Sequence, residues 1–376
     1  MECITTAHKP ADDRVKNLKA FKYLKWDNDV IGFIDRQFNV EFLNPNYNEV
    51  VTLYTKGCKK WSRDQFVEFL SERIVSRDRR DIERILFRCG LSTYDVLKIA
   101  FITKGIHSKD LLWIAENEDD AFNFAVTDVF ESIFIKKKDL EGDSVNSPEG
   151  YNIKRYGVFN DKYGIYKKRI SPMTTDVESE IAVYKLAQKL GIDCCPAYLV
   201  DENTMFSEFV YNFSEEYIVH FRRLFEGVRS DNEYRNLIEV RPQYKTDIIK
   251  MLILDYITRQ DDRHLSNIAI KVSKDGERFY PLYDNGRSLF YEDTEEMVEK
   301  ACEDVILYAT GFGYSGTYHD YLKDISDEGI DLAGLVNLNI TDREIEEILV
   351  SSNFTGYRLK GAKMWIRKAI EEIKNL

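Results

Sequence analysis

Residues 259–271 read RQDDRHLSNIAIK and place two aspartates, an arginine, a histidine and an asparagine directly before an apolar, β-prone run. Asp and Asn are favoured in turns because their side chains hydrogen-bond the local backbone, so each residue alone fits a charged surface turn. The apolar run predicts a strand, however, and a second strand, predicted after a turn at residues 274–276, leads into YDNG at residues 283–286. The sequence therefore poses a choice between a surface turn and a catalytic loop.

The composition is that of an ordinary soluble globular protein, with 44% apolar and 31% charged residues among 376. A chain of this length is typical of about two or three domains. Its formal net charge of −12 argues against a nucleic-acid coat protein, because phosphate backbones attract basic surfaces. We therefore do not expect nucleic acid as a partner of the whole chain.

The cysteines and the N-terminal residues point to a cellular compartment. The six cysteines show neither the spacing of zinc ligands nor the density of a small secreted disulfide scaffold. The N-terminal residues contain no apolar signal region, and no window approaches the roughly 18 apolar residues of a membrane span. These features predict a cytoplasmic protein without a membrane span.

Residues 1–128 are predicted to form an accessory module of short strands followed by helices. From residue 20 to 58, aromatic and β-branched residues alternate with polar ones, as in short strands. Apolar residues then recur at helical spacing, with a further helix for which Ser92 is a possible N-cap, so the module is expected to be α-rich. The basic cluster at residues 73–84 carries acidic residues at ion-pair spacing, which favours a solvated helix face over DNA contact.

A different order of elements follows a polar, linker-like run at residues 136–150. A strand hairpin is predicted around residues 160–164, and a well-marked helix comes next. Asp176 or Thr175 can cap this helix, and Gly191 stops it. A second hairpin then precedes a mostly helical remainder.

This order of parts is that of a two-lobed phosphotransferase. We therefore expect an α+β, protein-kinase-like fold after the N-terminal module. The expected bounds are residues 129–212 for a small β-rich N-lobe and residues 213–376 for a helical C-lobe.

Phosphoryl transfer needs few reactive side chains but several well-placed charges. An aspartate must take or orient the proton of the acceptor hydroxyl, and oxygen ligands must hold Mg²⁺ against the phosphates. Asp262 precedes Asn267 by five residues with His264 between them, and Asp284 ends a strand before Asn285 and a glycine. These residues supply a candidate for each of the two needs.

The segment DRHLSN is similar to the D-R-H-x-x-N catalytic loop of phosphatidylinositol 3/4-kinase-like enzymes, and YDNG resembles their counterpart of the protein-kinase D-F-G. The order and spacing of both motifs resemble most closely the bacterial HipA-like serine/threonine kinases, whose loop reads D-G-H-x-x-N. The resemblance implies that Asp262 is the catalytic base and that Asn267 and Asp284 bind Mg²⁺. His264 either braces the loop or takes part in proton transfer.

The resemblance extends upstream of the loop. IYKKRI resembles the strand that carries the nucleotide lysine, which implies Lys167 with Lys168 as the runner-up, because neighbours on a strand point to opposite faces. VESEIAVYKLAQKLGI resembles the next helix and implies Glu180 as the partner of the lysine, with Glu178 as an alternative.

The segment MFSEFVYN resembles the strand that connects the two lobes. The resemblance implies that the backbones of Glu208, Phe209 and Val210 hydrogen-bond adenine, so that ATP and Mg²⁺ are the implied cofactors.

The sequence departs from the kinase pattern in two places. No G-x-G-x-x-G loop is present, and residues 141–150 are the glycine-containing candidate for covering the phosphates. Ser144 and Ser147 in this segment are hypothetical regulatory phosphorylation sites. Asp261 beside Asp262 has no assigned role, and without a metal the pKa of one of them should rise.

We expect an ATP- and Mg²⁺-dependent kinase that phosphorylates a serine or threonine of a protein. A lipid or small-molecule kinase of the same fold is one alternative. Another is an inactive nucleotide-binding or interaction protein of a toxin–antitoxin or mobile-element system. The N-terminal module could bind an antitoxin-like or regulatory partner.

Overall fold

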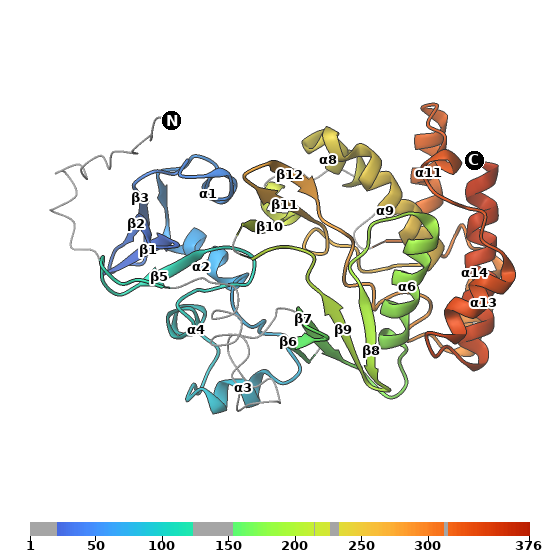
Figure 1. The fold of residues 1–376 in the computed structure, drawn as a ribbon, viewed down its shortest axis with the longest axis horizontal. Coiled ribbons are helices and arrows are strands. Elements are labelled where there is room, and N and C mark those ends of the chain that lie inside the picture. Colours follow the sequence, from blue (N-terminus) through green and yellow to red (C-terminus); the bar gives the residue numbers. More distant parts are fainter. Residues whose placement is uncertain (1–20, 123–152, 214, 226–232, 312–314) are drawn as a thin grey trace, which may run out of the picture. The chain divides into compact units, whose positions relative to one another are not determined.

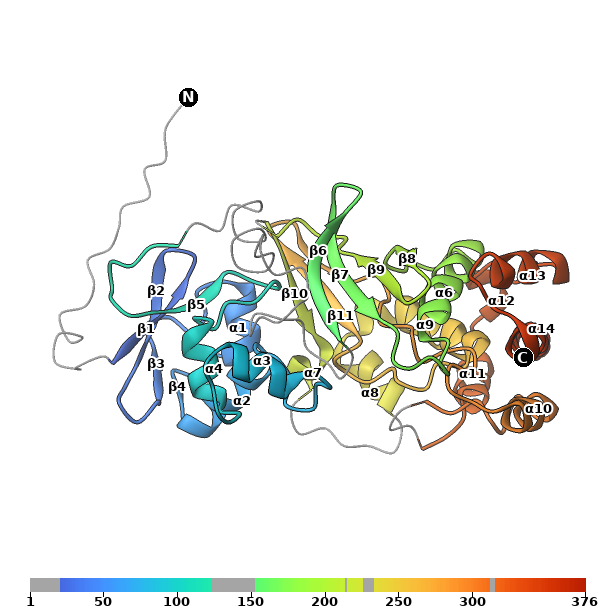
Figure 2. The ribbon, with the colours of Figure 1, turned by 90° about the horizontal axis from the view of Figure 1, so that it is seen from below.

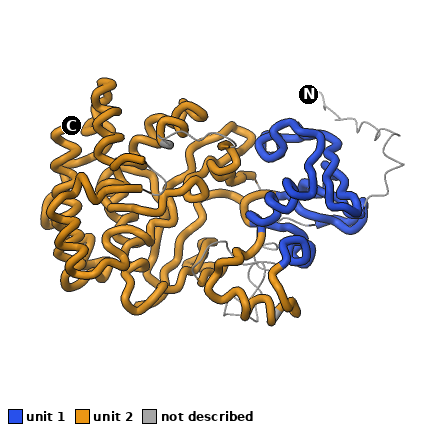
Figure 3. The backbone as a smooth tube through the Cα atoms, turned by 180° about the vertical axis from the view of Figure 1, so that it is seen from behind, with its two compact units in different colours: residues 1–73, 95–107, 111–123 blue, residues 74–94, 108–110, 124–376 orange. Residues whose placement is uncertain are grey.

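The structure is a computed structural model, shown in Figure 1. It describes residues 21–122, 153–213, 215–225, 233–311 and 315–376. The predicted linker with Ser144 and Ser147 lies outside the described residues. The chain divides into two compact units whose membership does not follow chain order, because residues 74–94 and 108–110 belong to the second unit (Figure 3).

Unit 1 is built on an antiparallel sheet with strand order β4-β3-β2-β1-β5. Its elements are β1 (Lys22–Trp26), β2 (Asp29–Ile34), β3 (Val40–Phe42), α1 (Glu49–Thr55), β4 (Lys60–Trp61), α2 (Arg63–Ser71), α4 (Val96–Ile102) and β5 (Leu112–Ala115). The predicted short strands and the helices after them are present, and the sheet also includes β5, a strand that was not predicted. All four residues of β5 are buried, and a short apolar run without alternation cannot be told from a helix by its periodicity.

The start of α4 also differs from the prediction. Asp95, not Ser92, is the N-cap, and its side chain accepts a hydrogen bond from the Lys98 backbone N–H at 3.0 Å. Both residue types cap helices well, and Asp95 is the one directly before the buried face formed by Ile99 and Ala100.

Unit 2 begins with a helix, α3 (Ile82–Arg88), and contains an antiparallel sheet with strand order β6-β7-β9-β8. Its strands are β6 (Lys154–Phe159), β7 (Lys162–Lys168), β8 (Ala197–Asp201) and β9 (Thr204–Glu208). The β6–β7 turn consists of Asn160 and Asp161, whose φ angles of 48° and 59° suit a tight hairpin turn with the twist of a sheet. Both predicted hairpins are confirmed.

Helix α6 (Asp176–Leu190) lies beside β8 and β9 in both views (Figures 1 and 2). It begins after Thr175 and ends at Gly191, which has a φ of 72° and donates its backbone N–H to the last turn. Its buried face includes Val177 and Ile181, which pack with the sheet residue Met205. The predicted helix is therefore present with both expected ends.

The rest of unit 2 contains a second antiparallel sheet and most of the helices. The strands are β10 (Glu216–His220), β11 (Ala269–Ser273) and β12 (Gly276–Phe279). The helices are α7 (Phe221–Leu224), α8 (Glu233–Val240), η3 (Pro242–Tyr244), α9 (Lys245–Thr258), α10 (Glu295–Glu303), α11 (Tyr318–Asp327), α12 (Leu332–Leu335), α13 (Asp342–Val350) and α14 (Gly356–Asn375). Helix α9 is almost wholly buried, and the Trp365 indole of α14 donates to the Tyr256 carbonyl of α9 at 3.0 Å.

This mixed helix-and-sheet architecture agrees with the predicted fold class, whereas the division into two lobes and its residue bounds stay predictions. Every helix in the described ranges is too short or too polar to cross a bilayer.

Candidate functional site

The loop at residues 259–268 connects the buried helix α9 to the buried strand β11. Arg259 ends the helix in the left-handed region with a φ of 50°. Gln260 is fully buried, and its carbonyl accepts a hydrogen bond from the Tyr318 hydroxyl at 2.8 Å. The loop is therefore anchored at its start by the helical core and at its end by the sheet.

Arg263 holds the loop from the inside. Its guanidinium contacts the Asp255 carboxylate of α9 at 2.9 and 3.0 Å, and both side chains are fully buried. Burial raises the pKa of Asp255, and the Arg263 charge opposes that rise. Arg263 therefore pairs with an acidic neighbour. Its guanidinium also donates to the Tyr283 carbonyl at 2.7 Å and to Asn285 Oδ1 at 2.6 Å.

The same loop is tied to the backbone of Asp284. Gln260 Nε2 donates to the Asp284 carbonyl at 3.2 Å, and Gln260 Oε1 accepts from the Asp262 backbone N–H at 2.9 Å. Together with Arg263, Gln260 brings the two sequence motifs, DRHLSN and YDNG, into one structure. Gln260 was not predicted as a site residue, because a buried glutamine beside a charged loop carries no distinctive sequence signal.

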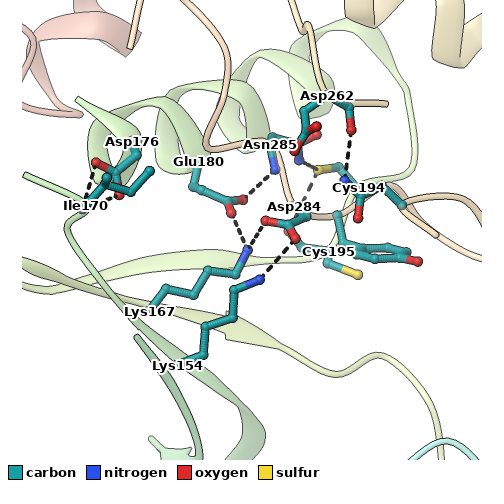
Figure 4. A network of polar contacts seen from close by, with 12 residues as sticks. Lys154, Lys167, Ile170, Asp176, Glu180, Cys194, Cys195, Asp262, Asp284 and Asn285 are labelled. Carbon is teal, nitrogen blue, oxygen red and sulfur yellow. Dashed lines mark hydrogen bonds and ion pairs between the residues drawn. The ribbon is translucent and has the colours of Figure 1, made fainter. Parts of the chain in front are cut away.

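Asp284 lies at the centre of a charged network (Figure 4). Its backbone adopts a φ of 57°, which is uncommon for a residue with a side chain and is typical of functional sites. Its carboxylate contacts Lys167 Nζ at 2.9 Å through Oδ1 and Lys154 Nζ at 3.2 Å through Oδ2. Burial alone would raise the pKa of Asp284, but the two ammonium groups hold it far below its ordinary range.

Lys167 points into this network from β7, and its ammonium contacts the Glu180 carboxylate of α6. Lys168 is exposed, as strand alternation requires. Burial favours the neutral form of Lys167, but Asp284 and Glu180 outweigh it and raise its pKa. Glu178, the alternative partner, pairs instead with Arg169.

Glu180 has a second task in the network. Its Oε2 accepts the Asn285 backbone N–H at 3.0 Å, so one carboxylate fixes both the lysine and the segment after Asp284. Asn285 Nδ2 donates to the Cys194 thiol at 3.4 Å. Burial raises the pKa of Cys194, so this thiol serves as a neutral packing group.

Lys154 is, like Gln260, a residue of the site that was not predicted from the sequence. It lies opposite Lys167 in the β6–β7 register, and both are buried, with 8% and 7% of their surface exposed. Residues directly opposite each other in an antiparallel pair point to the same face. Counting outward from the Asn160–Asp161 turn would have paired Lys154 with Lys167 from the sequence.

The strand that carries Lys154 is held from outside the sheet. Arg79 is fully buried and donates from Nη2 to the Lys154 carbonyl at 2.5 Å. Its Nε donates to Asp81 at 2.7 Å. Arg80 donates to the carbonyl of Ile170, just beyond β7. The predicted solvated helix face at residues 73–84 is thus wrong for Arg79 and Asp81, which hold the hairpin.

Asp262 and Asn267 face each other across the loop. Asn267 Nδ2 donates to the Asp262 carbonyl at 2.9 Å, and the Asp262 carbonyl also accepts the His264 backbone N–H at 2.9 Å. His264 Nδ1 accepts the Ser266 backbone N–H at 3.2 Å, which braces the loop. Burial raises the pKa of Asp262, and the His264 charge opposes that rise.

Asp261 points away from this arrangement. Its carboxylate contacts Arg287 Nε at 3.1 Å, and both side chains are over a third exposed. Burial raises the pKa of Asp261, with a smaller contribution from the Asp262 charge, whereas Arg287 opposes the rise. The prediction of a raised pKa in this aspartate pair is confirmed in direction, but burial is the main cause.

The described geometry can be compared with known structures. No protein-family model and no curated protein matches the sequence. HipA of Shewanella oneidensis MR-1, in a toxin–antitoxin complex with HipB and operator DNA, is 11% identical, with a TM-score of 0.53 over 94% of this chain and 97% of that chain. The chain has the HipA fold. The Helicobacter pylori proinflammatory kinase CtkA is 15% identical, with a TM-score of 0.48 over 61% of this chain and 90% of that chain.

The segment predicted to connect the two lobes, residues 205–212, uses its backbone donors within the protein. The N–H groups of Glu208 and Phe209 donate to the carbonyls of Pro196 and Tyr163 at 2.9 and 2.8 Å. Val210 N–H donates to the Tyr280 hydroxyl at 3.3 Å, a longer contact. Backbone bonds to adenine stay a prediction, and Val210 is the donor that would change partners most easily.

The oxygen donors of the site fit Mg²⁺. Mg²⁺ is usually bound by one or two protein ligands, with waters and substrate phosphates completing its shell. Within the described ranges, no group of three or more His, Cys, Asp or Glu residues is placed to hold a metal alone. Asn267 uses its amide nitrogen on Asp262, which leaves Oδ1 for a cation, and Asp284 offers a carboxylate that is 30% exposed.

Proposed function

We propose that this chain is an ATP- and Mg²⁺-dependent phosphotransferase that phosphorylates a serine or threonine hydroxyl of a protein. The observation that carries the proposal is the single network that joins the Lys167–Glu180 pair to Asp284 and, through Gln260, to the loop of Asp262. Phosphoryl transfer depends on such positioned charges more than on reactive side chains.

Each residue has a defined task in this proposal. Lys167, fixed by Glu180, positions the α- and β-phosphates. The oxygen of the acceptor hydroxyl forms a bond to the γ-phosphorus, and Asp262 accepts the proton of that hydroxyl. The bond between the γ-phosphorus and the β–γ bridging oxygen breaks, and its electron pair leaves with ADP. Mg²⁺, held by Asn267 and Asp284, would neutralise phosphate charge.

The surroundings of Asp262 suit a base. Its raised pKa makes the carboxylate more basic than an exposed aspartate, and a general base works best when its pKa lies closer to the working pH. The hydrogen bonds to its backbone N–H and carbonyl fix the residue without occupying the carboxylate.

The test is transfer of labelled phosphate from ATP with Mg²⁺. Asp262→Ala should lower turnover by about 10²- to 10⁴-fold while thermal shifts with ADP and Mg²⁺ remain. Asp275→Ala, in the exposed β11–β12 turn, is the matched control and should keep wild-type turnover. Undiminished turnover in Asp262→Ala would refute its role as the base.

The acceptor class is tested in the same assay. Protein, phosphoinositide vesicles and small alcohols are offered in turn, and label on protein serine or threonine supports the proposal. Label on lipid or small alcohol would favour a kinase of the same fold with another acceptor. Absence of nucleotide binding, ATP hydrolysis and autophosphorylation would favour the inactive interaction protein. An antitoxin-like partner bound through the N-terminal residues stays a prediction.

A further inference from the structure

The hydroxyl of Tyr280 contacts the predicted connecting segment, residues 205–212. The N–H groups of Glu208 and Phe209 donate to backbone carbonyls, whereas the Val210 N–H donates to the Tyr280 hydroxyl at 3.3 Å. A backbone carbonyl is fixed by the chain on both sides, but a hydroxyl is carried at the end of a side chain. The Val210 N–H can therefore exchange its partner without the loss of a backbone–backbone hydrogen bond.

The surrounding residues hold Tyr280 in this position. The residue is buried, and its backbone N–H donates to the Ala269 carbonyl of β11 at 2.9 Å. Its ring lies edge-on to the rings of Tyr211 and Tyr283, with centroids 6.1 and 5.8 Å away. Burial raises the pKa of Tyr280 well above its ordinary value. The hydroxyl thus keeps its proton and can both donate and accept hydrogen bonds.

The same hydroxyl also has a partner towards the phosphate end of the site. It hydrogen-bonds the Cys195 thiol. Burial raises the pKa of Cys195, the bond to Tyr280 opposes that rise, and the charges of Glu180 and Lys167 also act on the thiol. The hydroxyl therefore has one partner on the connecting segment, Val210, and another within electrostatic reach of the proposed phosphate lysine.

We infer that the Tyr280 hydroxyl competes with the nucleotide base for the Val210 N–H; this rests on the proposed function. A nucleotide whose phosphates bind Lys167 and whose base binds the connecting segment must extend between these two points. Ring nitrogen N1 of adenine is an acceptor, and it takes the Val210 N–H only when the Tyr280 hydroxyl has released it. Tyr280 is thus a residue that sets the affinity for the base.

The competition has a measurable cost for binding. One net hydrogen bond changes an equilibrium by roughly 2- to 10-fold. In the wild-type protein the bond from Val210 to the base replaces the bond from Val210 to Tyr280, so it adds little affinity. Without the hydroxyl the N–H loses this partner until the base binds, and the new bond then contributes fully. The protein without nucleotide becomes less stable, because an unpaired N–H that is shielded from water is unfavourable.

The experiment measures the binding of three probes by calorimetry in the presence of Mg²⁺. These are ADP, 1-deaza-ADP, in which a C–H group replaces N1, and pyrophosphate, which has no base. Tyr280→Phe removes the hydroxyl oxygen and keeps the ring. It should tighten ADP binding by roughly 2- to 10-fold and leave the affinities for 1-deaza-ADP and pyrophosphate unchanged. Its Tm without nucleotide should fall, and the rise in Tm caused by ADP should grow.

Tyr283→Phe is the matched control. It removes a hydroxyl from the neighbouring ring, which donates to the Ser266 carbonyl at 2.9 Å rather than contacting the connecting segment. The ratio of the ADP and 1-deaza-ADP affinities should stay as in the wild-type protein. Unchanged or weaker ADP binding in Tyr280→Phe, or equal tightening of ADP and 1-deaza-ADP, would overturn the inference.

A measurement on the wild-type protein decides if Tyr280→Phe does not fold. In protein labelled with ¹⁵N-valine, the Val210 amide resonance is identified by its loss in Val210→Ile. It should move when Mg·ADP binds and stay in place with Mg·pyrophosphate, and an unmoved resonance with ADP bound would overturn the inference. Phosphate transfer by the wild-type protein would leave the kinase proposal standing in that case. Failure of the wild-type protein to bind ADP would overturn both.

Discussion

Asp261 and Arg263 lie two residues apart in the loop, and each forms an ion pair, but the two pairs differ completely in their surroundings. Arg263 pairs with Asp255 with both side chains fully buried, whereas Asp261 pairs with Arg287 with 39% and 44% of the side chains exposed. The first pair joins α9 to the loop and, through Asn285, to the segment after Asp284. The second joins the loop to that segment at the surface.

The difference shows that burial, more than the types of side chain, determines how strongly the loss of one partner of an ion pair lowers the free energy of unfolding. Exposed pairs contribute about 0–1 kcal/mol because water and salt screen them. A buried pair contributes little over an apolar replacement, but removal of one partner leaves a buried charge and costs about 3–5 kcal/mol. Arg263 thus forms a buried ion pair in the core, and Asp261, two residues away in the same loop, forms an exposed one at the surface.

The largest expected effect comes from breaking the buried pair. Arg263→Ala should lower the free energy of unfolding by about 3–5 kcal/mol, because Asp255 would keep a buried charge without its partner. Urea unfolding measures the change. Arg287→Ala is the matched control and should cost less than about 1 kcal/mol. Similar decreases in the free energy of unfolding in the two variants would contradict the conclusion that burial makes the difference.

Replacing both partners separates stability from activity. Asp255→Leu with Arg263→Met should regain at least about 2 kcal/mol of the loss caused by Arg263→Ala, because no unpaired charge remains buried. Phosphate transfer should still fall at least about 100-fold, because Tyr283 and Asn285 lose the guanidinium that aligns them. Full activity in the double variant would show that Arg263 serves stability alone.

Salt sharpens the comparison at the exposed pair. The Debye length is about 3 Å in roughly 1 M salt, so the small cost of Arg287→Ala should vanish when NaCl is raised to that concentration. The cost of Arg263→Ala should persist, since ions do not reach the buried pair. Urea unfolding of both variants at low and high salt measures this, and a salt-insensitive Arg287 effect would mean that packing, not charge, holds the residue.

The smallest expected effect concerns an exposed carboxylate far from the loop in sequence. Glu344 accepts from the Thr341 backbone N–H at the start of α13 and contacts Lys189, which lowers its pKa to about 2. A carboxylate with a depressed folded-state pKa stabilises the fold above its unfolded pKa, and the contribution is lost as pH falls through about 2. Glu344→Gln should therefore lower Tm at pH 7 and approach wild type at pH 3; an equal difference at both pH values would contradict this.

Local patterns predicted much of the fold and part of the site. The hairpins and α6 followed from alternation, turn residues and helix stops, and strand alternation correctly placed Lys167 and Lys168 on opposite faces. The position of Lys154 opposite Lys167 could have been predicted in the same way, since the register of a hairpin follows from its turn. The buried strand β5 was not, because a short apolar run lacks a period.

Long-range partners could not be predicted from the sequence. Nothing local links Asp255, in an apolar helix, to Arg263 rather than to Arg259, the other arginine of the loop. Arg79 lies in a stretch whose charges alternate as on a solvated helix, yet it is buried against a strand from much later in the chain. Such pairings depend on tertiary packing, which overrides the local pattern.

The bond between Arg79 and Lys154 has a consequence for the order in which the protein can form. The two residues are 75 positions apart in the chain, so a ribosome adding about 5–20 residues per second needs roughly 4–15 s between them. During that interval the segment at residues 74–94 is completed, while the hairpin that it supports does not yet exist. The β6–β7 hairpin is therefore stabilised late in synthesis, by a segment that was made much earlier.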